Sequence, residues 1–97
     1  MDASELYKIA IGRLGIPNIH PLHKAMMEEC CEVVLQNKKD NVDDDTLVFA
    51  VHSAFTVSNT TLKATLGASL KISNTDQVIL NYRGQTFEIP KESKLLN

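Results

Sequence analysis

A stripe of apolar residues at helical spacing constrains the fold of this chain more than any other feature. From Leu22 to Val34, apolar side chains recur every three or four residues, which places them on one face of an α-helix. Pro21 suits the first position of that helix, because the N–H that proline lacks would have no partner there. The sequence therefore predicts a helix from Pro21 to about Gln36, where a polar run begins. The stripe consists of Leu22, Met26, Cys30, Val33 and Val34.

A shorter helix is predicted before this one. Asp2 followed by Glu5 is typical of a capping box, and apolar residues at helical spacing follow it. Glycine takes the left-handed backbone conformation that ends many helices, and proline cannot continue one. The run Gly15-Ile16-Pro17 therefore predicts the end of this helix at about Leu14.

A third helix is predicted to begin at Asp44 or Asp45, because acidic side chains offset the helix dipole at an N-terminus. Residues 47–57 are apolar almost all round, so this helix is expected to form the buried centre of the domain. Residues 58–72 fit both a helix and a strand. A cap-like Asn-Thr-Thr sequence within them favours a short helix that ends near Gly67.

The C-terminal part predicts a β-hairpin. Val78–Tyr82 and Gln85–Ile89 are rich in β-forming residues, and Arg83-Gly84 between them suits a tight turn because glycine accepts a positive φ. The predicted fold class is α+β, with three or four helices followed by a C-terminal β-hairpin. Residues 1–90 are expected to form a single globular domain, and residues 91–97 a flexible C-terminal tail.

Charge and cysteine content limit the classes of function. With 97 residues and a formal net charge of −2, the chain lacks the basic excess of a general nucleic-acid or membrane-surface binder. The two cysteines, Cys30 and Cys31, are neighbours that rarely bond each other on a helix, so a reducing compartment is expected. The start of the chain has no signal-peptide pattern, and the longest apolar run, Leu47–Val51, is too short to cross a membrane. We expect a cytoplasmic protein with no membrane contact.

Histidine and cysteine side chains on the second predicted helix raise the question of a zinc site. His20, His23, Cys30 and Cys31 are all of ligand types that zinc prefers. The helical rise of ~1.5 Å per residue separates His23 from Cys30 by about 10 Å. Zinc–ligand bonds of about 2.0–2.3 Å cannot bridge that distance. No metal and no cofactor are therefore expected.

The sequence EECCE on the same helix carries three carboxylates, Glu28, Glu29 and Glu32. It resembles the EExxE motif of the all-α NTP pyrophosphohydrolases, in which helical carboxylates hold Mg²⁺ against a triphosphate. That family also has a second acidic pair, ExxD, on the next helix. An antiparallel pairing of the second and third predicted helices places His52, and no carboxylate, opposite Glu29. The resemblance therefore implies at most a degenerate pyrophosphohydrolase-like protein, and the other interpretation is a solvated helix face.

Residues 51–72 resemble the helix-turn-helix of winged-helix regulators, with VSNTTL as the turn and the start of a recognition helix. The hairpin would then be the wing. Thr56 and His52 depart from the pattern, because they occupy positions usually held by glycine and by a small residue. The segment also offers few basic residues to neutralise phosphates, so charge disfavours nucleic-acid binding. This resemblance implies DNA contacts from Asn59, Thr60, Lys63 and Arg83.

The preferred interpretation is a small non-enzymatic regulatory or adaptor protein that binds a protein partner. The glycines are too scattered for a phosphate loop, and no nucleophile has a local catalytic signature. The second predicted helix carries another row of soft apolar groups, Met27, Cys31 and Leu35, beside its main stripe. Methionine and cysteine suit adaptable surfaces. This row is predicted to face a larger protein or a second copy of the chain, and the alternative is that all of it is core.

Overall fold

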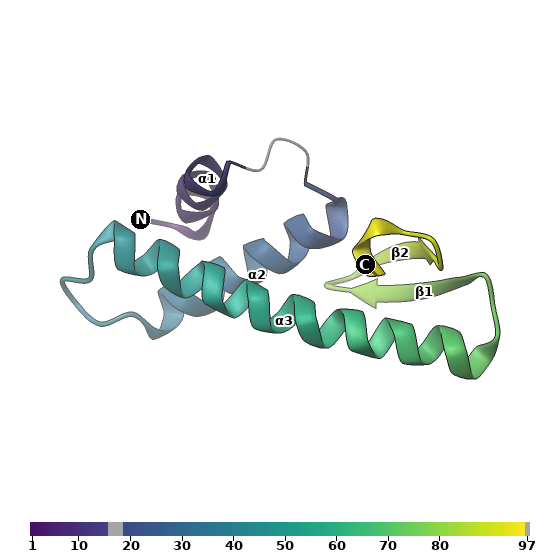
Figure 1. Cartoon of the computed structure of the whole chain (residues 1–97). Helices are drawn as coiled ribbons and strands as arrows, with labels where there is room; N and C mark the ends of the chain where they lie inside the picture. Colours follow the sequence, from purple (N-terminus) through teal and green to yellow (C-terminus); the bar gives the residue numbers. More distant parts are fainter. Residues whose placement is uncertain (16–18, 97) are drawn as a thin grey trace. The chain divides into compact units, whose positions relative to one another are not determined.

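A computed structural model of the chain describes residues 1–15 and 19–96 (Figure 1). Three helices precede an antiparallel two-stranded hairpin, which confirms the predicted α+β class. The chain divides into two compact units, Met1–Val57 and Ser58–Asn97, and the division falls within the third helix. Ile16 and Pro17, part of the predicted helix stop, lie outside the described residues. The elements are α1 (Ala3–Leu14), α2 (Pro21–Asn37), α3 (Asp44–Ser73), β1 (Gln77–Tyr82), β2 (Gln85–Pro90) and the 3₁₀ turn η1 (Lys94–Leu96).

Both ends of α1 are capped as the sequence predicts. Oδ1 of Asp2 accepts a hydrogen bond from the Glu5 N–H at 2.9 Å, so a donor that the helix leaves unpaired finds a partner. Gly15 has a φ of 65°, and its N–H donates to the Ile11 carbonyl at 3.0 Å. Glycine adopts this left-handed conformation without the steric cost of a side chain, so Gly15 determines where α1 ends.

α2 begins at Pro21, as predicted, and ends at Asn37, close to the predicted Gln36. Its N-cap is a residue that the sequence pattern did not indicate. Nδ1 of His20 accepts a hydrogen bond from the Leu22 N–H at 3.0 Å. Asp, Asn, Ser and Thr are the usual residues at this position, which is why sequence reasoning missed the cap.

The start of α3 uses its acidic residues for capping and for ion pairing. Asp43 lies just before the helix, and its Oδ1 accepts a hydrogen bond from the Thr46 N–H at 2.8 Å. Hydrogen bonds from the Thr46 side chain and backbone, with a smaller effect of Arg13, lower the pKa of the Asp43 carboxyl. Arg13, in the last turn of α1, also pairs with Asp45 in the first turn of α3.

Replacing Asp43 with alanine is expected to lower the thermal unfolding midpoint at neutral pH, because the Thr46 N–H loses its acceptor. Asp43→Asn keeps an accepting oxygen and should have a smaller effect. A carboxyl whose pKa is lowered on folding stabilises the fold above its unfolded pKa, and this contribution is lost as the pH falls through the folded pKa. The difference between wild type and Asp43→Asn should therefore disappear in acid. Thermal denaturation followed by circular dichroism measures these effects, and equal midpoints for wild type and Asp43→Ala at neutral pH would contradict them.

α3 continues without a break to Ser73, so the predicted helix end near Gly67 is wrong. Residues 58–72, which fitted both helix and strand, are helical. A hydroxyl here bonds within the helix, since Thr65 Oγ1 donates to the Thr61 carbonyl at 3.0 Å. Hydroxyls bonded in this way do not divert the backbone from the helix, so the polar sequence does not end it. No helix in the described part of the chain combines the length and the apolar character needed to cross a membrane.

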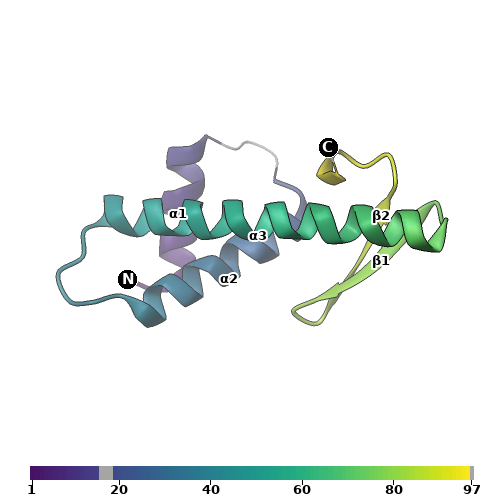
Figure 2. The same cartoon turned by 60° about the horizontal axis from the view of Figure 1, so that its bottom comes forward.

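The core of the unit Met1–Val57 takes one face each of α1, α2 and the first part of α3. α1 packs against α2 and crosses it steeply (Figure 2). The side chains of Phe49 and Val57 are 71% and 68% exposed, so this part of α3 is not buried all round as predicted. In so small a unit, neighbouring helices cover only one side of α3. The buried cluster contains Leu6, Ala10, Met27, Cys30, Cys31, Leu47, Val48 and Val51.

In the unit Ser58–Asn97 the predicted hairpin is confirmed. Arg83 and Gly84 have φ values of 53° and 79°, and two positive φ values are what a tight turn between right-twisted strands requires. Alternate residues of β2 are buried, as expected for a strand with one covered face. The buried side chains are Phe87 and Ile89.

The C-terminal tail makes contacts that the expectation of a flexible tail did not include. The Lys91 N–H donates to the Asp76 carbonyl at 2.9 Å, and the Lys91 ammonium lies 3.2 Å from an Asp76 carboxylate oxygen. Leu95, in η1, is buried with 7% of its surface exposed. Residues 91–96 are therefore joined to the segment before β1 by a backbone bond and an ion pair.

Candidate functional site

The predicted partner-binding row on α2 is part of the core. Met27 and Cys31 have no exposed surface, and Leu35 is partly buried against the same cluster. α1 covers this row, because Leu6 and Ala10 pack into the cluster that contains it. Met27 and Cys31 are therefore core residues, and only Leu35 of this row retains exposed surface.

Burial also determines the chemistry of Cys31. Burial, with smaller contributions from Cys30, Glu28 and Glu32, raises the pKa of the Cys31 thiol to about 11. Only the thiolate is a good nucleophile or metal ligand, so this group is unreactive at neutral pH. Cys31 therefore acts as a small apolar core residue.

The histidines that were considered as zinc ligands have other contacts. His20 caps α2 through its Nδ1 atom. The His23 ring packs edge-on against the Phe55 ring, with centroids 5.3 Å apart and planes at 86°. Cys30, on the same helix as His23, is buried in the core cluster.

The carboxylates of EECCE do not converge on a metal site. Glu28, Glu29 and Glu32 are partly buried along α2. Within residues 1–15 and 19–96, no group of three or more His, Cys, Asp or Glu side chains could hold a metal ion. His52, expected opposite Glu29, is exposed. The geometry therefore gives the pyrophosphohydrolase interpretation no support.

The helix-turn-helix interpretation is wrong because it requires a turn that does not exist. The segment expected to form that turn lies inside the continuous helix α3. Arg83, the expected wing-tip residue, lies in the hairpin turn, where its positive φ serves the turn itself. Three of the residues expected to contact DNA lie in the middle of α3. These are Asn59, Thr60 and Lys63. Within α3, no separate helix and turn precede them, although a helix-turn-helix motif requires both.

An apolar groove lies where the end of α2 meets the start of α3. Its volume is about 410 Å³. Val33, expected in the buried stripe, lines the groove instead and is 49% exposed. The loop between the helices supplies part of the wall, and its Asn41 adopts a φ of 66° to reverse the chain. The apolar lining residues are Val33, Val34, Val42, Leu47 and Ala50.

The charged residues that line this groove are both basic, whereas the loop between α2 and α3 also carries Asp40 and Asp43. Lys38 and Lys39 belong to its lining, and no carboxylate does. Phe49, which precedes the lining residue Ala50 on α3, is not part of the lining and is 71% exposed. Sequence reasoning missed this surface because Val33 and Phe49 fit the patterns of buried helix faces.

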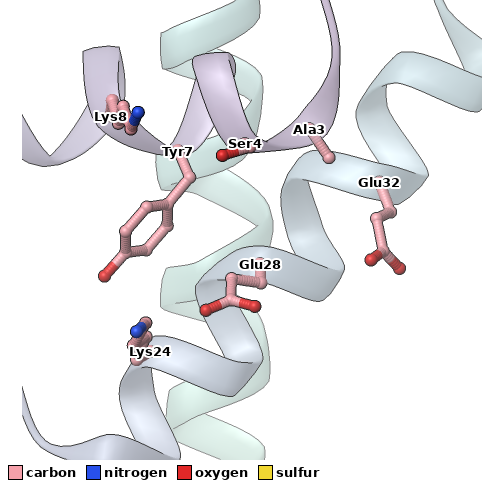
Figure 3. A pocket seen from close by; sticks show the side chains of 7 residues that line it. All are labelled: Ala3, Ser4, Tyr7, Lys8, Lys24, Glu28 and Glu32. Atoms are coloured by element: carbon pink, nitrogen blue, oxygen red, sulfur yellow. The ribbon is translucent and has the colours of Figure 1, made fainter.

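A second cavity, of about 390 Å³, lies between α1 and α2, and charged residues of both signs are among those that line it (Figure 3). α1 contributes Ala3, Ser4, Tyr7 and Lys8, and α2 contributes Lys24, Glu28 and Glu32. The Tyr7 ring reaches from α1 toward Lys24, and the Glu28 carboxylate lies beside them (Figure 3). We call this cavity the polar pocket.

The polar pocket places a phenol between charges of both signs. Burial, with the nearby carboxylate of Glu28 and the thiol of Cys31, raises the pKa of the Tyr7 hydroxyl. The hydroxyl therefore remains a hydrogen-bond donor at neutral pH. Lys24 and Glu28 are one helical turn apart on the opposite wall.

Two cavities of similar volume thus differ in chemistry: one is largely apolar with two lysines in its lining, and the other is lined by charged residues of both signs. Both lie within the unit Met1–Val57. No family model, curated protein or solved structure significantly matches this chain.

Proposed function

We propose that this protein is a small non-enzymatic regulatory or adaptor protein that binds a protein partner through the apolar groove between α2 and α3. The observation that supports this proposal is the groove itself, an apolar concave surface with a half-exposed Val33 in its wall. The proposal keeps the preferred interpretation of the sequence and replaces its binding surface, because the row of Met27, Cys31 and Leu35 is core.

Physical chemistry favours a protein segment as the occupant. Covering apolar surface contributes roughly 25 cal/mol per Å², and the groove provides such surface in a concave form. Lys38 and Lys39 favour a partner that carries acidic residues beside its apolar ones. The partner we expect is therefore a protein with an apolar segment flanked by carboxylates. This partner can be another protein or a second copy of the chain.

Site-specific photo-crosslinking tests this proposal. A photoreactive residue at Val33 should trap the partner in cells, whereas the same residue at Ile79, exposed by 61% in the other unit, should not. The purified partner should then bind wild type and bind Val33→Asp at least about tenfold more weakly, the loss expected at an interface anchor. Equal crosslinking at both positions, or equal affinity of wild type and Val33→Asp, would overturn the proposal.

A further inference from the structure

We propose that the polar pocket between α1 and α2 binds a small zwitterion of the amino-acid or dipeptide type. In this proposal the carboxylate of the ligand binds Lys24 and its ammonium group binds Glu28, two side chains that line the pocket. This site is separate from the apolar groove, and the inference does not depend on the protein-binding proposal.

The walls of the pocket are held by the core. Tyr7 directly follows Leu6, and Glu28 directly follows Met27, and both preceding residues are completely buried. Leu6 and Met27 belong to the same buried cluster, so the spacing of the two walls is determined by core packing. A site supported in this way can bind a ligand without first being ordered.

Charge pairing points to a ligand with both signs. Lys8 on α1 and Lys24 on α2 provide two cations, and Glu28 provides an anion within the same cavity. None of the described residues forms a hydrogen bond or ion pair with the side chains of these three residues. A simple anion would be repelled by Glu28, and a simple amine by the lysines, whereas a zwitterion can satisfy both.

Size and hydrogen bonding agree with this ligand class. A cavity of about 390 Å³ falls in the lower range of small-molecule sites and holds an amino acid or a dipeptide. The Tyr7 and Ser4 hydroxyls supply donors next to the charged groups. Glu32 lies one further turn along α2 and also lines the pocket, so α2 contributes two carboxylates to it.

Titration followed by ¹⁵N–¹H NMR tests the proposal, with glycylglycine as the probe. Saturable shifts are expected at the amides of α1 and α2 that line the pocket. Acetate and ethylammonium, which each carry one of the two charges, should bind at least about tenfold more weakly. Lys24→Met and Glu28→Gln should each weaken glycylglycine binding about tenfold or more, while the exposed Lys71→Met should leave it unchanged.

The outcomes separate this proposal from the protein-binding proposal. Val33→Asp, which changes only the groove, should bind glycylglycine as wild type does. The absence of saturable shifts at millimolar glycylglycine, or acetate binding as tight as that of glycylglycine, would overturn the zwitterion site. Circular dichroism of Lys24→Met and Glu28→Gln should match wild type, because Lys24 is exposed, Glu28 is only partly buried, and neither side chain belongs to the core cluster.

Discussion

Met27→Glu is expected to unfold the helical unit Met1–Val57. The Met27 side chain has no exposed surface and lies in the cluster shared by the three helices. A carboxylate there would be buried without a partner, at a cost of several kcal/mol. Small domains are stable by only about 5–15 kcal/mol, so one such change can remove most of the free energy of unfolding. Urea denaturation followed by circular dichroism measures the loss.

Val33→Glu is the matched control for this prediction. It introduces the same side chain into the same helix, but Val33 is 49% exposed. The new carboxylate reaches water there, so the unfolding free energy should change by no more than about 1 kcal/mol. An unchanged urea midpoint for Met27→Glu would contradict the core position of Met27 and would restore the row of Met27, Cys31 and Leu35 as a candidate partner surface.

Raising the pH from about 9 toward 11 is expected to destabilise the same unit. Burial raises the pKa of the Cys31 thiol from 9.0 to about 11, so between these values the folded thiol keeps a proton that the unfolded thiol has lost. The folded state then binds more protons than the unfolded state, and stability falls as the pH rises. A pKa shift of two units lowers the free energy of unfolding by about 3 kcal/mol at most. The raised pKa of the Tyr7 hydroxyl acts in the same direction.

The pH effect is measured by urea denaturation at a series of pH values in this range. Cys31→Ala removes the thiol, and its unfolding free energy should fall less steeply with pH than that of wild type. Parallel curves for the two proteins would show that Cys31 does not titrate with a raised pKa. A thiol reagent at neutral pH provides a second readout, since both buried cysteines should react only after unfolding.

The sequence did not predict the apolar groove or the polar pocket, because each is formed by residues of two different helices. Tyr7 and Lys24 face one cavity from different helices, and so do Val33 and Ala50 in the groove. Each residue taken alone fits an ordinary helix pattern, and only the pairing across helices produces a concave surface. Ridges of side chains on the two helices determine the angle at which they cross, and this angle decides which residues meet.

The sequence by itself determined the features that depend on a few neighbouring residues. Asp2, Gly15 and Pro21 delimit α1 and α2, and Gly84 forms the hairpin turn, because caps and turns act over a single turn of chain. Only the tertiary structure decided which apolar residues of α2 are covered. α2 carries two apolar rows and most of both is buried, while Val33, at the end of the first row, stays at the surface. Which of these residues are buried depends on close packing against residues that are distant in the sequence, and local patterns do not specify that packing.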